Sequence, residues 1–146
     1  MKKIILKSIL ILSVLQPSFA FAEEGEAPKT RVGPGKAVLE ATMENGIRLS
    51  EKAANNLELR LSPIQRNGTI TIPTAALVKF QDFYAVYRKR DGWFKMIEVE
   101  PLVTNGTSTV SSKDLKMGDE IVIENAELLR VVDLDVWGPE ADACVD

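Results

Sequence analysis

Residues that commonly carry out chemistry in proteins are scarce in this sequence. It contains no histidine and a single cysteine, Cys144. Without histidine the chain lacks the usual general base near neutral pH and the commonest metal ligand. A reactive thiol needs an electropositive setting, whereas Cys144 lies among Glu140, Asp142 and Asp146. We therefore interpret Cys144 as an incidental or intermolecular thiol rather than a catalytic nucleophile.

Carboxylates are the remaining candidates for acid–base chemistry. Glu98 and Glu100 would share one face of a predicted strand, and a pair of carboxylates is what glycoside hydrolysis requires. The ordinary alternation of an exposed strand face explains the same spacing. The serines have neither a histidine partner nor the G-x-S-x-G motif of hydrolases. The sequence thus predicts a protein that is not an enzyme.

A metal site would have to use cysteine, methionine and carboxylate side chains. Soft sulfur ligands select Cu(I), but no M-x-M or M-x-x-M spacing is present, and Met96 fits an apolar strand as core filler. Three acidic residues near the C-terminal end could gather a hard cation weakly, but a solvated acidic face is much the better explanation of them: Glu127, Asp133 and Asp135. We predict no dedicated metal site and no cofactor.

The densest grouping of functional side chains spans residues 80–94, where six aromatic residues interleave with three basic ones. Stacking and cation–π contacts would suit a ligand platform. A hairpin with a packed aromatic face and a charged tip fits the same pattern. Because Arg and Trp often dominate interfaces, we take the expected exposed tip as the candidate partner-binding site: Arg88, Lys89, Arg90 and Trp93. The double exchange Arg88→Glu with Arg90→Glu should then weaken partner binding without changing the melting temperature.

The elements that must position these side chains are mostly strands. Apolar residues alternate with polar ones, and Asn-Gly and Asp-Gly pairs mark turns. Asn67-Gly68 is typical of a hairpin turn. Strands are expected in eight segments: 36–43, 57–61, 69–72, 75–80, 83–88, 93–103, 107–111 and 120–124.

The strand expected at 93–103 has apolar residues on both of its faces. Phe94 and Met96 share one strand face while Ile97 and Val99 share the other, which a bulge or a buried first half would explain. In the strand 120–124, Ile121 and Ile123 are expected to face inward.

Two short helices complete the expected fold. Ser50 is a favourable N-cap for a helix over 52–56. A helix of about two turns within 126–134 would turn Leu128, Val131 and Val132 toward the core. The fold class is therefore mainly β, a small β-sandwich or barrel-like domain with two short helices.

The first 22 residues are typical of a removable export signal. Two lysines precede a short apolar run, and Ala20-Phe21-Ala22 matches the small-x-small cleavage pattern. The run is far shorter than a bilayer span requires. We expect cleavage after Ala22, a periplasmic location and no transmembrane segment thereafter. The organisation would be signal peptide 1–22, flexible leader 23–35, β-rich domain 36–137 and acidic tail 138–146.

Charge argues against nucleic acid as a partner. The chain carries 18 basic and 21 acidic residues, a net charge of −3. Loss of the signal would remove three lysines and no acid, which leaves −6. No basic cluster exceeds the three residues 88–90, so the basic footprint of a nucleic-acid-binding protein is absent.

Several segments resemble the periplasmic adaptor subunits of RND-type efflux pumps, also called membrane fusion proteins. The segment 71–78 is similar to the family's late "x-V-P-x-x-A-l-v" strand, and 84–95 to its "v-y-V-f … g-x-f" hairpin. The segment 115–122 is similar to "g-L-k-x-G-d-x-V-V". Weaker likenesses cover 47–52, 57–59 and 128–130.

The resemblance extends over about residues 36–137 and concerns the membrane-proximal portion of such adaptors. It implies a β-rich module that binds an inner-membrane RND-type transporter or another adaptor protein, without catalytic residues. Residues 62–70 stand where a full adaptor carries its lipoyl-like domain and coiled-coil hairpin. The residues themselves also leave open a periplasmic carrier or sensor of a small ligand or metal.

Overall fold

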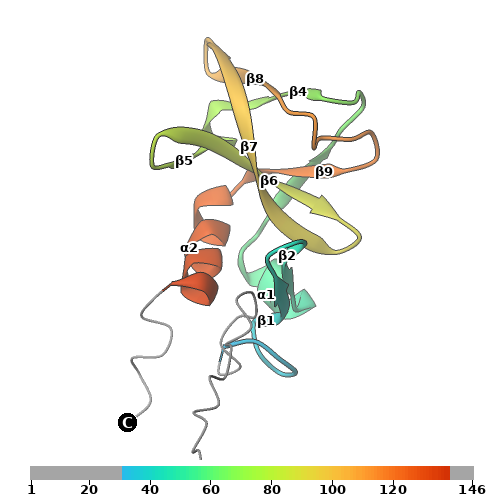
Figure 1. The fold of residues 1–146 in the computed structure, drawn as a ribbon, viewed down its shortest axis with the longest axis vertical. Coiled ribbons are helices and arrows are strands. Elements are labelled where there is room, and N and C mark those ends of the chain that lie inside the picture. The colour runs from blue at the N-terminus through green and yellow to red at the C-terminus, as the bar shows by residue number, and fades with distance from the viewer. Residues whose placement is uncertain (1–30, 139–146) are drawn as a thin grey trace, which may run out of the picture.

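A computed structural model describes residues 31–138 of the chain. The predicted signal 1–22, the leader up to residue 30 and residues 139–146 with Cys144 lie outside the described residues. Within the described range the chain is mainly β with two short α-helices, which confirms the predicted fold class (Figure 1). The strands are β1 Val38–Thr42, β2 Gly46–Leu49, β3 Arg60–Pro63, β4 Thr69–Pro73, β5 Val78–Phe80, β6 Phe83–Arg90, β7 Trp93–Thr104, β8 Thr107–Ser111 and β9 Glu120–Glu124. The helices are α1 Glu51–Asn56 and α2 Ala126–Trp137, with a short 3₁₀ turn η1 Thr74–Ala76.

The strands form one open, branched antiparallel sheet. Its main path runs β1-β2-β7-β6-β9-β3, while β5 pairs with β6 and β8 pairs with both β7 and β4. The twelve-residue strand β7 connects the two ends of the molecule, because its first half pairs with β6 and its last residues pair with β8. Figure 1 shows β4 and β8 at one end and α2 with the β1–β2 hairpin at the other.

The β6–β7 hairpin lies at the centre of the sheet. Asp91 and Gly92 both have positive φ, 51° and 82°, and such a two-residue turn matches the twist of its strands. The register runs without a shift from Arg90 opposite Trp93 to Tyr84 opposite Val99. The bulge considered for residues 93–103 is therefore wrong, and burial of both strand faces accounts for the two apolar sets.

Two separate cores cover the two faces of the sheet. The first lies toward the helices and contains Val38, Ile47, Leu49, Val78, Tyr87, Phe94, Val122, Ala126, Leu129 and Val136. The second lies toward β4 and β8 and contains Ile64, Ile72, Ala76, Leu77, Val86, Ile97, Val99, Val110, Leu115 and Ile121. Strand β9 contributes to both, since Ile121 and Val122 are each fully buried while Ile123 is only partly buried. The prediction that Ile121 faces inward is thus confirmed. Ile123 is buried only in part, and the burial of Val122 was not predicted.

The turn at Asn67-Gly68 forms, but the predicted hairpin does not. Strand β3 pairs with β9, and β4 pairs with β8. The turn instead docks on the loop between β8 and β9, where the N–H of Gly68 donates to the carbonyl of Leu115 at 2.7 Å. A local turn signal does not specify which strands pair, and here longer-range packing decides the pairing.

Two predicted strands are shortened by local backbone geometry. The segment 75–80 begins as the turn η1, which buries Ala76, and only Val78–Phe80 form a strand. The segment 57–61 becomes a strand only from Arg60, because Glu58 adopts a positive φ of 50°. The alternating pattern therefore predicted the positions of these two strands correctly but made both of them too long.

The helices follow their predicted starts, but the buried face of α2 differs from the prediction. Ser50 caps α1, its hydroxyl oxygen accepting a hydrogen bond from the N–H of Ala53 at 3.2 Å. Helix α2 is twelve residues long and buries Ala126, Leu129 and Val136. Leu128 and Val131 were expected to face the core, yet they are 49% and 65% exposed. Only Val132 of the predicted face packs against the first core.

The described end of the predicted leader makes backbone contacts with the domain. Val32 pairs with Val38 in an isolated bridge, and the N–H of Gly33 donates to the carbonyl of Val38 at 3.0 Å. Among residues 31–138 no helix is both long enough and apolar enough to cross a membrane.

Candidate functional site

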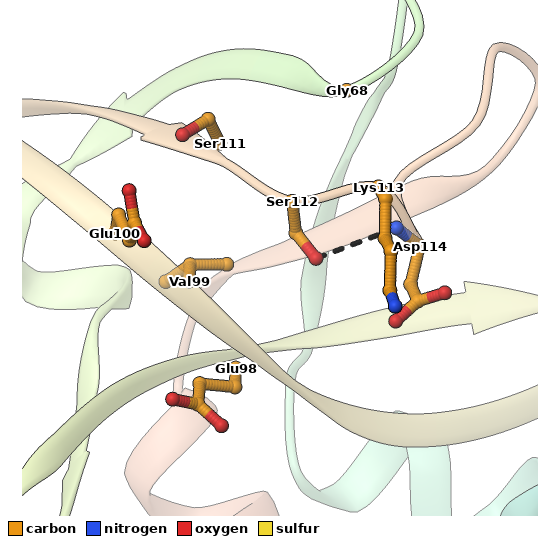
Figure 2. A pocket seen from close by; sticks show the side chains of 8 residues that line it. All are labelled: Gly68, Glu98, Val99, Glu100, Ser111, Ser112, Lys113 and Asp114. Atoms are coloured by element: carbon orange, nitrogen blue, oxygen red, sulfur yellow. Dashed lines mark hydrogen bonds between the residues drawn. The ribbon is translucent and has the colours of Figure 1, made fainter.

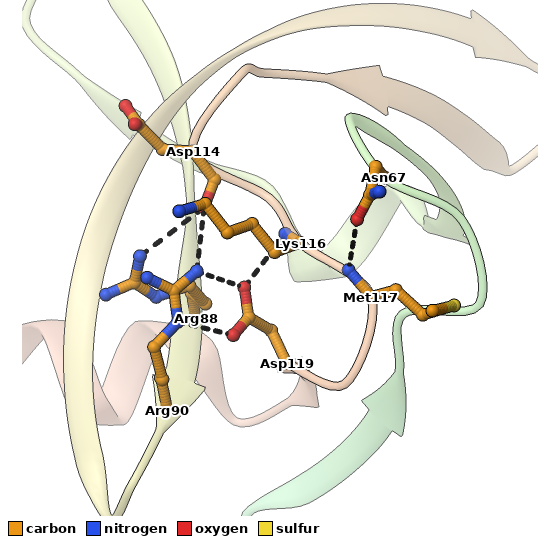
Figure 3. A network of polar contacts seen from close by, with 7 residues as sticks. All are labelled: Asn67, Arg88, Arg90, Asp114, Lys116, Met117 and Asp119. Carbon is orange, nitrogen blue, oxygen red and sulfur yellow. Dashed lines mark hydrogen bonds and ion pairs between the residues drawn. The ribbon is translucent and has the colours of Figure 1, made fainter.

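The residues proposed from the sequence do not form an open tip. Arg88 is only 8% exposed, because β9 lies beside this part of β6 and pairs Ile121 with Arg88. The guanidinium of Arg88 lies against the loop between β8 and β9 (Figure 3). The expected exposure of Arg88 is therefore wrong, and the turn Asp91-Gly92 occupies the tip instead.

Arg90 is held in a two-pronged ion pair. Its Nε and one terminal nitrogen each donate to an oxygen of Asp119 at 2.6 Å (Figure 3). The Asp119 side chain is only 4% exposed, and it also accepts a hydrogen bond from the N–H of Lys116 at 2.9 Å. Both arginines further reach the carbonyl of Asp114, at 3.4 Å from Arg88 and 3.3 Å from Arg90.

The protonation of this network follows from burial and charge. Burial by itself would raise the pKa of Asp119, but the hydrogen bonds from Arg90 and Lys116 outweigh it and hold that pKa below its ordinary value. Burial, reinforced by the positive charge of Arg90, lowers the pKa of Arg88. The Nε of Arg88 has no hydrogen-bond partner in the described part of the chain. One buried carboxylate thus stabilises two closely spaced guanidinium groups.

The other two candidate residues also have partners within the domain. Lys89 pairs with Glu120 at 3.2 Å, and the guanidinium of Arg48 lies 4.8 Å from the ring centroid of Trp93. Because Arg88 is buried and Arg90 pairs with Asp119, the double exchange of Arg88 and Arg90 for glutamate is expected to lower the melting temperature, contrary to the unchanged value expected from the sequence. The role of these four residues in partner binding stays a prediction from the sequence.

A shallow polar hollow of about 560 Å³ lies where β7 passes from β6 to β8. Glu98 and Glu100 of β7 line it together with Ser111, Ser112, Lys113 and Asp114 (Figure 2). Both glutamates are exposed, as alternation on a strand surface predicts. In residues 31–138 no three acidic side chains are grouped so that they could hold a metal ion.

A second, more apolar groove was missed by the sequence analysis. It lies between α2, the turn after β1 and strands β6 and β7, with a volume of about 510 Å³. The turn approaches β7 closely at Gly46, where a Cβ would lie 2.2 Å from the carbonyl oxygen of Phe94. Glycine at this position therefore lets the hairpin pack against β7 and form one wall of the groove.

Asp133 links the helix to the sheet at this groove. One carboxylate oxygen accepts from the Tyr87 hydroxyl at 2.8 Å and the other from the Trp137 indole N–H at 3.0 Å. Burial raises the pKa of Asp133 above its ordinary value, although the two hydrogen bonds oppose the shift. Burial and the nearby carboxyl group also raise the pKa of Tyr87. The only signal in the sequence was the spacing of four between Asp133 and Trp137, which places both on one helix face.

The pH dependence of stability should reveal Asp133. Its raised pKa in the folded state means that the folded protein binds the proton more tightly than the unfolded chain. This stabilising contribution is complete below the ordinary Asp pKa and is lost as the pH rises through the raised value. We expect urea unfolding from about pH 3.5 to 7 to show wild type losing stability relative to Asp133→Asn. Parallel curves for the two proteins would contradict the burial of this carboxyl group.

An exposed apolar stripe marks the outer face of α2. Leu128, Val131 and Leu134 recur every three residues, and their exposed fractions are 49%, 65% and 47%. Residues at such spacing lie on one side of a helix. We call these three residues the α2 stripe.

No family model, curated protein or solved structure matches the chain.

Proposed function

We propose that this protein is a non-catalytic binding module of the bacterial cell envelope. It docks through the α2 stripe onto an inner-membrane RND-type transporter or a second adaptor protein. The observation that carries the proposal is the exposure of Leu128, Val131 and Leu134 on a helix whose opposite face already fills the core. Water-exposed apolar clusters are typical of interaction sites.

The charge around the α2 stripe defines the partner surface. Glu127 is exposed beside the three apolar residues, whereas Asp135 there is paired with Arg31. A complementary partner therefore presents an apolar surface with a basic group facing Glu127. The export signal and the resemblance of residues 36–137 to efflux adaptors favour a transporter or adaptor as that partner. Both are properties of the sequence and support the proposal independently of the helix.

The test exchanges two stripe residues for acids. We expect Leu128→Glu with Val131→Glu to reduce recovery of the transporter or adaptor from envelope extract about tenfold, with an unchanged melting temperature. The matched control is Leu102→Glu with Val103→Glu, since these residues are 70% and 57% exposed at the other end of the molecule. The control should recover the partner as wild type does.

Three outcomes would contradict the proposal. Equal loss with the stripe and control variants would indicate non-specific apolar binding. Undiminished recovery by the stripe variant would exclude α2 as the docking surface. Absence of any transporter or adaptor from the wild-type sample would remove the proposed function itself.

A further inference from the structure

The groove beside α2 has the size and lining of a small-molecule site. Its volume of about 510 Å³ falls within the range of about 300–1,000 Å³ typical of such sites. Its walls include Met43, Phe80, Met96, Leu134 and Trp137. They come from the turn after β1, the end of β5, strand β7 and helix α2, so that packing of four elements holds the groove in shape.

The buried polar groups of the groove already satisfy one another. Both oxygens of Asp133 accept hydrogen bonds, from Tyr87 and from Trp137. A ligand therefore needs no polar group to satisfy Asp133. The part of the ligand that enters the groove is expected to be apolar, since aromatic and thioether side chains dominate its walls.

The charged residues that line the groove indicate the sign of the ligand's polar group. Two of the three are basic, Lys95 and Arg130, and the third is Asp133, whose two oxygens already accept hydrogen bonds. The guanidinium of Arg130 lies 5.1 Å from the ring centroid of Phe80 and donates to the carbonyl of Lys79. A guanidinium has five N–H donors arranged to bind a carboxylate or phosphate. The Lys95 ammonium also donates to the carbonyl of Glu44, and together these two cations favour an anionic ligand over a cationic one.

We propose that this groove binds a small amphiphilic anion, an apolar chain or ring with one carboxylate, sulfonate or phosphate group. The apolar part lies against Met43, Met96 and Trp137, and the anionic group contacts Arg130. The groove shares Leu134 with the α2 stripe, but Leu128 and Val131 do not line it. Exchanges at those two residues therefore test docking through the stripe separately from binding in the groove.

The first test compares two probes of opposite charge whose alkyl chains are of nearly equal length. Titration calorimetry should show decanoate binding with a dissociation constant below about 1 mM, and decyltrimethylammonium binding at least about tenfold more weakly. The indole N–H signal of Trp137 should shift with decanoate in NMR spectra, whereas that of Trp93 should not. Equal affinity for the two probes would overturn the proposal in favour of a purely apolar site.

Variants at the rim locate the binding. Met43 is 70% exposed, so Met43→Glu adds a negative charge to the groove with little risk to folding, and Met117→Glu is its matched control at 69% exposure. We expect the first to weaken decanoate binding about tenfold and the second to have no effect. Arg130→Gln should weaken binding similarly, with Arg60→Gln as its control.

The proposal fails if Met43→Glu binds decanoate as wild type does, or if wild type binds none up to about 1 mM. It also fails if Leu128→Glu with Val131→Glu abolishes decanoate binding, because the probe would then occupy the α2 stripe. If that variant loses its partner but still binds decanoate, the result supports the groove as the decanoate site and bears only on the α2 stripe.

Discussion

Replacement of Asp119 by alanine should destabilise the protein by about 1.5–3 kcal/mol, the typical value for hydrogen bonds to a charged group, because Asp119 is buried whereas the Arg90 side chain is 33% exposed. The side chain of Asp119 is 4% exposed and forms both 2.6 Å contacts with Arg90. Its removal leaves the positive charges of Arg88 and Arg90 close together without the negative charge that offsets them. Small domains have only about 5–15 kcal/mol of stability in total, so a large loss in melting temperature is expected.

A surface ion pair provides the control for this change. Glu124 pairs with Arg60 at 2.8 Å, but the two side chains are 49% and 67% exposed, and such pairs contribute about 0–1 kcal/mol. Urea unfolding should therefore separate Asp119→Ala clearly from Glu124→Ala. Equal effects would mean that Asp119 is solvated and that the loop between β8 and β9 is not held by this contact.

The same pair predicts a direction for acid sensitivity. Because the pKa of Asp119 is lowered in the folded state, its stabilising contribution is present above the ordinary Asp pKa. That contribution is lost as the pH falls through the lowered value. The difference in the free energy of unfolding between wild type and Asp119→Asn should therefore become smaller below about pH 4.

Strand positions were predictable because alternation and turn residues are local signals. The strands 107–111 and 120–124 were placed as the structure has them, and the hairpin turns at Asp91-Gly92 and Asn105-Gly106 form at residues with positive φ. Pairing was less predictable. Asn67-Gly68 resembles these turns, yet β3 and β4 pair with strands from the C-terminal half, and no local pattern encodes that choice.

The candidate site was less predictable than the fold for a related reason. The charge of residues 88–90 was evident, but the burial of Arg88 depends on β9, which lies about thirty residues further along the chain. The groove beside α2 combines residues from positions 42–46, 80–96 and 130–138. Only the packing of the helix on the sheet brings these segments together.

The second large effect is expected within α2, where neighbouring leucines differ in environment. Leu129 is fully buried in the first core, whereas Leu128 is 49% exposed. Leu129→Ala should cost about 2–5 kcal/mol, the usual range for truncation of a buried leucine. Leu128→Ala should change the free energy of unfolding by no more than about 0.5 kcal/mol.

The two variants share the same exchange, the same helix and the same small change in helix propensity. Their difference in the free energy of unfolding therefore measures burial alone, and urea unfolding at neutral pH provides it. A larger effect at Leu128 would restore the inward face predicted from the sequence pattern and would withdraw the α2 stripe as a docking surface. A stable Leu128→Ala variant that loses its partner would instead separate the two roles of this helix. Leu129 would then belong to the face needed for folding, and Leu128 to the face needed for binding.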